Sequence, residues 1–359
     1  MNNISPIDIA SLKEQLNDRN ILKALIPAHR YLAELKGVAK SIPNEDILLS
    51  TLVLQEAQDS SEIENVITTQ DALYKHRLQS SFGDIATKEV TNYADGLAVG
   101  YKHIQQHKLL TLNTILDIQS TLENNHAGFR KVPGTALRNE QTGEIVFTPP
   151  SPEKIPKLMA NLENLLNEQM PDIDPLVIMA VVHHQFETIH PFYDGNGRTG
   201  RIINILYLVK EDLLHSPILY LSRYINQSKA DYYHLLQQTR VTGEWQAWLI
   251  YMIKGVELTA KHTIELIEQI KQLLQKQKHQ IREEYKFYSQ DLLNNIFQHP
   301  YTKVQFLEHE LNVSRATATR YLDALANGGI LEKHKLGREN YYLNKELVEL
   351  LFSTPRMFS

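Results

Sequence analysis

The stretch from His190 to Arg201 gathers a base, a carboxylate, three glycines and two arginines into twelve residues. Gly195 and Gly197 let backbone N–H groups turn toward one point, because glycine has no Cβ to clash. A helix that begins at this point adds the positive end of its dipole, so the stretch predicts an anion-binding loop sized for phosphates. The carboxylate of Asp194 is an oxygen ligand suited to Mg²⁺. The imidazole of His190 is a candidate general base at the edge of the loop.

Two helices are predicted to hold this loop. Asp174 and Pro175 read as an N-cap and a proline in the first helical turn, and apolar residues then recur at helical spacing as far as His190. Pro191 disfavours helical geometry at the residue before it, so the helix should end with the imidazole facing the loop. Residues 202–209 are apolar on almost every side, which predicts a buried second helix. The two arginines of the loop are three residues apart and should share a face of its first turn.

The twelve residues resemble, position for position, the HxFx(D/E)GNGRxxR signature of the Fic family. A Gly-Asn-Gly turn or a histidine at a helix end is commonly structural when it occurs alone, but all of these groups in this order are a specific signal. Fic proteins are mainly α-helical enzymes that move AMP from ATP onto a protein hydroxyl and release pyrophosphate. The resemblance implies that His190 is the catalytic base and that Asp194 holds Mg²⁺. It implies nucleotide contacts from Gly195, Asn196, Gly197, Arg198, Thr199, Gly200 and Arg201.

A second pattern lies upstream, in residues 46–67, which predict one long helix with Asn44 as a candidate N-cap. Ser60 and Glu64 are four residues apart and share a face, which by itself is typical of a solvated helix surface. However, the run Ser-Ser-Glu-Ile-Glu-Asn that begins at Ser60 is similar to the (S/T)xxxE(G/N) pattern of the inhibitory helix in many Fic proteins. The resemblance implies that Glu64 pairs with Arg201 and displaces the γ-phosphate of ATP.

Residues 134–147 form two short extended runs around a polar turn, which predicts a β-hairpin. A surface decoration is the alternative, although an isolated hairpin is marginal in water and must lean on the helices. In Fic enzymes such a flap holds the target as an added strand, so the implied partner is a protein with a hydroxyl acceptor. Residues 130–134 and 148–150 would be its hinges. Tyr233, and more weakly Asn226, are candidate adenine contacts, although a single tyrosine is more commonly a packing residue.

Four residues near the loop raise the alternative of a transition-metal site: His183, His184, Glu187 and His190. Their spacing is H-x-x-E-x-x-H rather than H-E-x-x-H, and consecutive histidines point about 100° apart on a helix. We therefore do not expect a transition-metal site. Trp245 and Trp248 are expected in the core.

The C-terminal part predicts a long amphipathic connector helix over residues 255–288 and a separate unit over residues 290–343. This unit reads as helices, a Ser-capped helix and a two-stranded wing, which is a winged-helix pattern. Four residues lie where a recognition helix would read DNA: Arg315, Thr317, Thr319 and Arg320. Acidic residues nearly offset the basic ones in this unit, so protein contacts are an equally open role.

The chain has 359 residues, a formal net charge of -5 and no cysteine. This length allows two or three cores, and the mild acidity gives no sign of bulk attraction to nucleic acid or acidic lipid. The lack of cysteine excludes disulfides and thiolate metal sites and suits a reducing cytosol. Neither a signal peptide nor an apolar run long enough for a membrane is recognisable, so we expect a cytoplasmic protein without membrane contact.

The expected fold is mainly α, with a Fic-type helical core, a β-hairpin flap and a C-terminal winged-helix domain. The expected regions are an N-terminal helical region with the inhibitory helix (1–100), a catalytic core (101–260), a connector helix (261–288) and a winged-helix-like domain (289–359). The connector helix is also a candidate homodimer contact.

The expected function is that of an autoinhibited, ATP-dependent and Mg²⁺-dependent protein adenylyltransferase. It would transfer AMP to Ser, Thr or Tyr hydroxyls of target proteins and of itself, with His190 as the base and Glu64 inhibiting through Arg201. Two alternatives stay open. One is a Fic enzyme that also or only removes AMP, with Glu64 positioning a water molecule. The other is a DNA-binding regulator whose Fic part senses a nucleotide.

Overall fold

The structure, a computed structural model, describes residues 4–42, 44–138 and 142–353, and these residues are mainly helical. The mainly α fold predicted from the sequence is confirmed. Among these residues, every helix is either too short or too polar to span a lipid bilayer. Two positions lie outside the described residues: Pro43, where the sequence predicts a break because proline interrupts a helix, and the tip of the predicted hairpin at 139–141.

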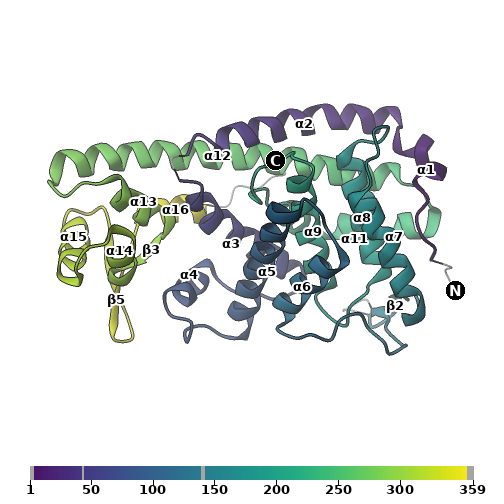
Figure 1. The fold of residues 1–359 in the computed structure, drawn as a ribbon, viewed down its shortest axis with the longest axis horizontal. Coiled ribbons are helices and arrows are strands. Elements are labelled where there is room, and N and C mark those ends of the chain that lie inside the picture. The colour runs from purple at the N-terminus through teal and green to yellow at the C-terminus, as the bar shows by residue number, and fades with distance from the viewer. Residues whose placement is uncertain (1–3, 43, 139–141, 354–359) are drawn as a thin grey trace.

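Two long helices, α2 (Arg19–Ala39) and α12 (Gln246–Glu284), lie side by side along one edge of an elongated molecule (Figure 1). Both begin at the same end, where the side chain of Gln246 donates to Asp18 over 2.7 Å. With 39 residues, α12 is about 58 Å long. It therefore extends past α2 and reaches the C-terminal unit.

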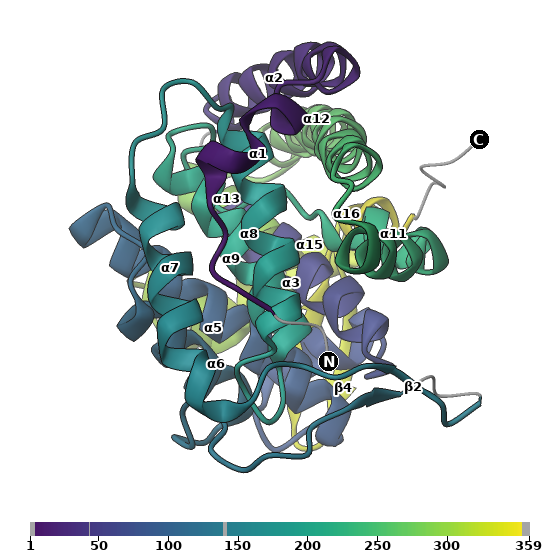
Figure 2. The same cartoon turned by 90° about the vertical axis from the view of Figure 1, so that its right-hand side faces the viewer.

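The other helices form a bundle beneath this pair, with α8 and α9 near its middle (Figure 2). The helices before the hairpin are α1 (Ile9–Leu16), α3 (Asp46–Ile63), α4 (Gln70–Leu78), α5 (Ile85–His107) and α6 (Leu112–Glu123). The elements between the hairpin and α12 are the 3₁₀ turn η1 (Pro152–Lys154), α7 (Ile155–Asn167), α8 (Pro175–Ile189), α9 (Asn196–Lys210), α10 (Ser222–Gln227) and α11 (Lys229–Thr242).

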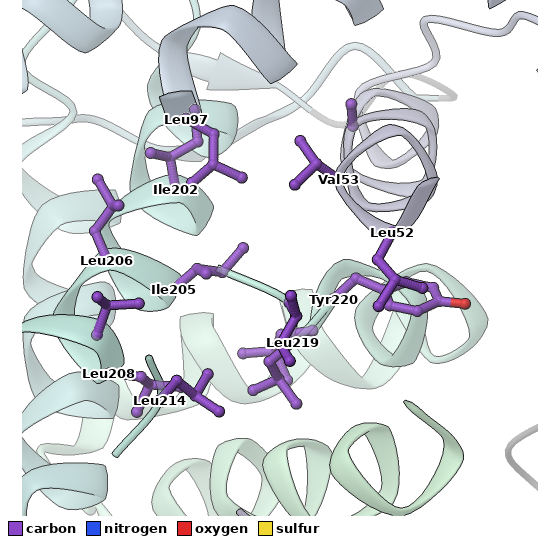
Figure 3. Close-up of a cluster of buried hydrophobic side chains, with 14 of the residues drawn as sticks. Leu52, Val53, Leu97, Ile202, Ile205, Leu206, Leu208, Leu214, Leu219 and Tyr220 are labelled. Atoms are coloured by element: carbon purple, nitrogen blue, oxygen red, sulfur yellow. The ribbon is translucent and has the colours of Figure 1, made fainter. Parts of the chain in front are cut away.

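The centre of the bundle is α9, in which every residue from Arg198 to Val209 is buried. The predicted buried second helix is therefore confirmed. Figure 3 shows the apolar cluster that α3, α5, α9 and the following loop form around it: Leu52, Val53, Leu97, Ile202, Ile205, Leu206, Leu208, Leu214, Leu219 and Tyr220. Close packing on all sides fixes α9, and so it also fixes the residues of its first turn.

Both ends of α8 follow the sequence prediction. Asp174 caps its start by accepting the N–H of Leu176 over 2.9 Å, and Pro175 is the first helical residue. The helix ends at Ile189, and His190 takes a left-handed conformation with φ 50°. The imidazole therefore leaves the helix where the loop begins.

Two predictions for the N-terminal region are wrong in detail. α3 ends at Ile63 rather than near residue 67, because Asn65 turns into the left-handed region with φ 62°. Asparagine tolerates this conformation better than most residues do. In α2, the helical spacing of Leu22, Leu25, Ile26 and His29 predicts one buried face, but Leu22 and Ile26 are exposed. The buried face consists of Ile21, Leu25, Ala28, Leu32, Leu35 and Ala39.

The long C-terminal helix begins earlier than predicted, at Gln246 instead of residue 255. Gly255 lies inside it, where an added Cβ would come within 2.7 Å of the Tyr224 ring. This glycine serves close packing against α10 rather than a helix start. The predicted boundary between residues 260 and 261 thus falls inside α12, so the core and the connector share one helix.

The hairpin consists of β1 (Leu137–Arg138) and β2 (Ile145–Phe147), which pair antiparallel. It leans on α11, as an isolated hairpin must. The Arg240 guanidinium lies 4.1 Å from the centroid of the buried Phe147 ring. Gln237 donates to the carbonyl of Val146 over 3.2 Å.

The C-terminal unit follows the predicted order of helices, Ser-capped helix and two-stranded wing. Its elements are α13 (Gln290–Gln298), β3 (Tyr301–Lys303), α14 (Val304–Leu311), α15 (Arg315–Asn327), β4 (Glu332–Leu336), β5 (Glu339–Leu343) and α16 (Lys345–Phe352). Ser314 caps α15, and the antiparallel sheet has the order β3-β5-β4. β3 and α16 were not predicted. The unit packs on the N-terminal region, where the ring of Tyr301 stacks on Tyr74 at 5.1 Å.

Candidate active site

One cavity of about 1060 Å³ collects predicted site residues from α3, α8, α9 and α11. The hairpin closes one side of it. A volume of this size is typical of nucleotide-sized ligands. The predicted residues that line it are Glu64, His190, Gly197, Arg201 and Tyr233.

His190 faces this cavity as a neutral base. Burial lowers the pKa of its imidazole to about 4, and the positive charges of Arg240 and Arg130 act in the same direction. At neutral pH the imidazole is therefore uncharged, and one of its two ring nitrogens has a lone pair that can accept a proton. Within the described ranges, Nδ1 has no hydrogen-bond partner.

The loop after His190 is held by its own asparagine. Asn196 Oδ1 accepts the N–H of Phe192 over 2.9 Å, and its Nδ2 donates to the carbonyl of the same residue over 3.0 Å. The Phe192 ring is fully buried and packs against Phe129. The side chain of Asn196 thus shapes the loop, and the backbone of the first turn of α9 is left to meet an anion.

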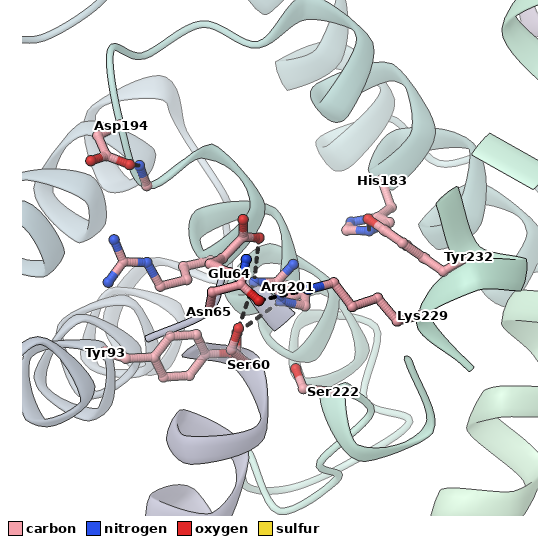
Figure 4. Close-up of polar contacts among 12 residues, drawn as sticks. Ser60, Glu64, Asn65, Tyr93, His183, Asp194, Arg201, Ser222, Lys229 and Tyr232 are labelled. Atoms are coloured by element: carbon pink, nitrogen blue, oxygen red, sulfur yellow. Dashed lines mark hydrogen bonds and ion pairs between the residues drawn. The ribbon is translucent and has the colours of Figure 1, made fainter. Parts of the chain in front are cut away.

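Asp194 is exposed in the middle of the loop. Its Oδ1 accepts the N–H of Gly195 over 2.7 Å, which fixes the carboxylate. Figure 4 shows it on the opposite side of the first turn of α9 from His183 and Tyr232. No group of three metal-ligating side chains exists among the described residues. A single oriented carboxylate fits Mg²⁺, which usually takes its other ligands from phosphates and water.

Arg201 is held by the end of α3 (Figure 4). Its Nε donates to Ser60 Oγ and its Nη2 to the Ser60 carbonyl, both over 2.8 Å. Nη2 also donates to Glu64 Oε1 over 2.9 Å. An added Cβ at Gly197 would lie 2.1 Å from the same carboxylate oxygen. The Glu64 carboxylate therefore rests directly on the first turn of α9, where the sequence predicts the anion site.

Arg198 points to different partners. Its Nη2 donates to Glu123 at the end of α6 over 3.0 Å, and its Nη1 to Glu89 of α5 over 3.3 Å. It does not line the cavity with Arg201. The two arginines therefore do not present one common clamp in this structure, and a phosphate contact from Arg198 requires these ion pairs to open.

The remaining predicted residues lie in different surroundings. Tyr233 lines the cavity and is 42% exposed. Thr199 and Gly200 are buried inside the first turn of α9 rather than at the cavity. Asn226 lies outside the cavity and donates to Asp59 of α3 over 3.3 Å. Trp248 is fully buried, and Trp245 is nearly so, as predicted.

The two consecutive histidines of the metal alternative, His183 and His184, have separate partners. His183 Nε2 bonds the Tyr232 hydroxyl over 2.8 Å, and His184 Nε2 bonds the carbonyl of Leu236 over 3.1 Å. Burial lowers the pKa of each ring to about 3. Both are therefore neutral packing residues of α8.

Three residues with ionisable side chains around the cavity were not among the predicted catalytic or nucleotide-binding residues. Glu187 lines it one turn before His190, and burial raises the pKa of its carboxyl to about 7. Arg240 of α11 donates to the carbonyl of Glu187 over 2.9 Å. Arg130 bonds the backbone around His190. The spacing of Glu187 from His190 was visible in the sequence, whereas the two arginines act across more than fifty residues.

The fold and the cavity define a class, namely a helical protein with an anion-binding loop and a base at the end of the preceding helix. Three family models match the chain in succession. They are the Fic/DOC family N-terminal model (residues 22–102), the Fic/DOC family model (109–208) and the C-terminal domain of protein adenylyltransferase SoFic-like (273–347). The chain belongs to the Fic/DOC family.

Curated relatives carry the name of an enzyme. The chain is similar to protein adenylyltransferase Fic of Drosophila mojavensis, with 27% identity over 189 residues, which covers 50% of this chain and 36% of the relative. It is also similar to a probable protein adenylyltransferase of Aquifex aeolicus, with 39% identity over 104 residues, 29% of this chain and 32% of the relative. The aligned part thus spans about a third of the length of these relatives.

Solved structures share the fold. A Fic family protein from Desulfovibrio desulfuricans aligns over 98% of this chain and 100% of its own, with a TM-score of 0.59 and 19% identity. Fic-1 from Caenorhabditis elegans aligns over 73% of this chain and 74% of its own, with a TM-score of 0.51 and 19% identity. At these identities the likeness concerns the fold alone.

Proposed function

We propose that this chain is an autoinhibited, ATP-dependent protein adenylyltransferase. It transfers AMP to a hydroxyl side chain of a target protein, and also to itself because its own hydroxyls are at high local concentration. The observation that carries the proposal is the contact of Glu64 with Arg201 in the same cavity as a neutral His190. Family membership and the names of the relatives support the reaction class.

In the proposed reaction, His190 takes the proton of the acceptor hydroxyl. The acceptor oxygen forms a bond to the α-phosphorus, and the bond from that phosphorus to the bridging oxygen breaks as pyrophosphate leaves. Backbone N–H groups at the start of α9 stabilise the charge that develops on the phosphate oxygens. Their positions are fixed by the buried helix behind them, so little reorganisation accompanies the step.

Asp194 is the residue that would hold Mg²⁺, because its carboxylate is exposed and oriented by the Gly195 N–H. When bound there, the ion neutralises charge on the phosphates. The protein supplies one carboxylate, and substrate phosphates and water complete the coordination.

Glu64 inhibits by occupying Arg201. A carboxylate and a phosphate compete for the same guanidinium donors, and charge-assisted bonds of this kind are stronger than neutral ones. The resemblance implies that Arg201 binds the γ-phosphate, and in that case the bound carboxylate opposes productive ATP binding. Removal of AMP from a modified target is the second candidate function. It is favoured by the position of the Glu64 carboxylate against the first turn of α9, from which it can orient a water molecule.

The target is proposed to bind at the hairpin as an added strand. β2 is short, and its residues Ile145 and Val146 are exposed beside the cavity. Backbone pairing would bring an acceptor hydroxyl to the base without requiring a particular side-chain sequence.

Intact mass spectrometry tests the proposal. We expect the Glu64→Gly variant to gain AMP on itself or on a lysate protein after incubation with ATP and Mg²⁺, and the wild type to gain less. His190→Ala in the Glu64→Gly background should abolish the gain. If neither form of the protein adds mass, while the chain shifts a DNA fragment in a salt-dependent manner, the nucleotide-sensing regulator becomes the better account.

A further inference from the structure

Arg130 bonds three successive carbonyl groups around the base. Its Nε donates to the carbonyl of His190 over 2.8 Å, and its Nη2 donates to that of Ile189 over 3.4 Å. Its own backbone N–H donates to the carbonyl of Pro191 over 2.9 Å. The side chain is buried, with 2% exposure, so these bonds are shielded from water.

The backbone that Arg130 holds is strained. His190 has φ 50°, and the left-handed conformation costs a residue with a Cβ about 1–2 kcal/mol. Such a conformation persists only where the surroundings determine it. The last carbonyls of α8 have no partners within the helix, and a cation at this end also complements the helix dipole. The guanidinium of Arg130 donates to these carbonyls and places a positive charge at the C-terminal end of α8, next to His190.

The same guanidinium reaches the hairpin. Arg130 belongs to the chain segment that leads into β1, and its Nη2 also donates to the carbonyl of Pro150, just after β2. One side chain therefore joins both ends of the hairpin to the backbone of His190. Under the proposed function, the hairpin is the surface that holds the acceptor segment, and His190 is the group that deprotonates the acceptor hydroxyl.

We propose that Arg130 is a positioning residue for the base. It keeps the His190 backbone in the conformation that directs the imidazole into the cavity, and it couples that conformation to both hinges of the hairpin. This inference rests on the proposed role of His190. It adds a residue that neither touches the nucleotide nor lies in the signature.

The charge of Arg130 gives a second, separable effect. The charged groups that act on His190 are Arg130 itself, Arg240 of α11, Glu64 at the end of α3 and Asp194 in the loop. The arginines lower the pKa of the imidazole, and the two carboxylates raise it. Replacing Arg130 by a neutral residue should therefore raise this pKa, whereas lysine should leave it nearly unchanged.

The test compares Arg130→Met and Arg130→Lys in the Glu64→Gly background, where AMP transfer is measurable. Arg130→Met keeps much of the side-chain volume but loses the N–H donors of the guanidinium and its charge. Arg130→Lys keeps the charge but loses the planar arrangement of N–H donors. We expect kcat to fall about a hundredfold in Arg130→Met, because misplaced reacting groups lose most of their orientation. KM for ATP should stay within about twofold. Arg30→Met is the control for the loss of one positive charge, because Arg30 is exposed on the surface of α2.

The pH dependence separates the two effects. Transfer requires the neutral imidazole, so kcat/KM falls below the pKa of His190. This acid limb should move to higher pH in Arg130→Met and stay in place in Arg130→Lys, although Arg130→Lys also loses kcat. NMR titration of the His190 ring checks the same shift without turnover.

A kcat in both variants within about twofold of the Glu64→Gly parent would overturn the inference, as would a rise in KM for ATP at unchanged kcat. If Arg130→Met does not fold, Arg130→Lys decides alone, and full kcat in that variant rejects the positioning role. Failure of the proposed function looks different, because transfer would then survive His190→Ala in the parent.

Discussion

Glu64→Gly is expected to strengthen ATP binding about tenfold and leave ADP binding nearly unchanged. Arg201 makes two hydrogen bonds to Ser60 and one to Glu64, and the last of these is the proposed inhibitory contact. The substitution removes only the last of these. Ser60 keeps the guanidinium in place, so the variant frees donors without loosening the residue that carries them.

The size of the effect follows from the bond that is lost. A hydrogen bond between charged groups contributes about 1.5–3 kcal/mol. Glu64 is 35% exposed, so water screens its charge and the lower end of that range applies. About 1.5 kcal/mol corresponds to a factor of about ten in the dissociation constant. Glu64→Gln keeps the shape and loses the charge, so it should fall between the wild type and Glu64→Gly.

Calorimetric titration with ATP and with ADP measures this directly. All forms should carry His190→Ala so that no turnover occurs during the titration. Glu62→Gln is the matched control, because Glu62 is an exposed carboxylate two residues away on the same helix. The expected gain applies to ATP because the resemblance brings only its γ-phosphate to Arg201.

Equal ATP affinities in the wild type and Glu64→Gly would refute the competition between carboxylate and phosphate. An equal gain for ATP and ADP would also contradict it, since the γ-phosphate would then not be the group that Glu64 displaces. A gain in ATP affinity in the Glu62→Gln control would show that negative charge in this region weakens nucleotide binding, rather than the contact of Glu64 with Arg201.

Three further changes have defined outcomes. Asp194→Asn should raise the Mg²⁺ concentration for half-maximal transfer by about tenfold or more, measured by magnesium titration, because the site loses its charged ligand. Tyr233→Ala should weaken ATP binding about threefold to tenfold in the same calorimetric assay, since the ring at the cavity wall is lost. Burial raises the pKa of Glu187 from 4.5 to about 7, so its contribution to stability is present below 4.5 and is lost as pH rises through 7. Glu187→Gln should therefore lose less stability than the wild type between pH 5 and pH 8 in urea unfolding.

Sequence rules predicted the parts of the site that depend on neighbouring residues. The cap at Asp174, the stop before Pro191 and the buried helix after the loop each follow from local chemistry, and each is present. Glycine spacing likewise indicated where the chain turns. The link between Glu64 and Arg201 spans 137 residues, and it was predicted only because the two short patterns resemble a known family.

Contacts made across the fold could not be predicted from local patterns. Arg198 was expected beside Arg201, but Glu89 and Glu123 from two other helices bind it instead. The connector helix was expected to begin at residue 255, but Gly255 lies inside the helix and packs closely against Tyr224. Arg130 read as part of a hinge, and its bonds to backbone carbonyls sixty residues away leave no trace in side-chain spacing.

Under the proposed autoinhibition, the position of Glu64 would allow release without movement of α3. α3 is fixed by buried polar contacts, since Glu56 accepts hydrogen bonds from α5 and α10. Gln55 accepts a hydrogen bond from Tyr220, just before α10, and donates to the carbonyl of Leu351 in the C-terminal unit. Ser60 is fully buried and stays bonded to Arg201. Glu64, by contrast, is the residue at which α3 ends, and it is partly exposed. Under the proposed autoinhibition, a rotation of this one side chain would remove the carboxylate from Arg201 while Ser60 keeps the guanidinium in place. Activation would then cost one ion pair rather than the unpacking of a helix.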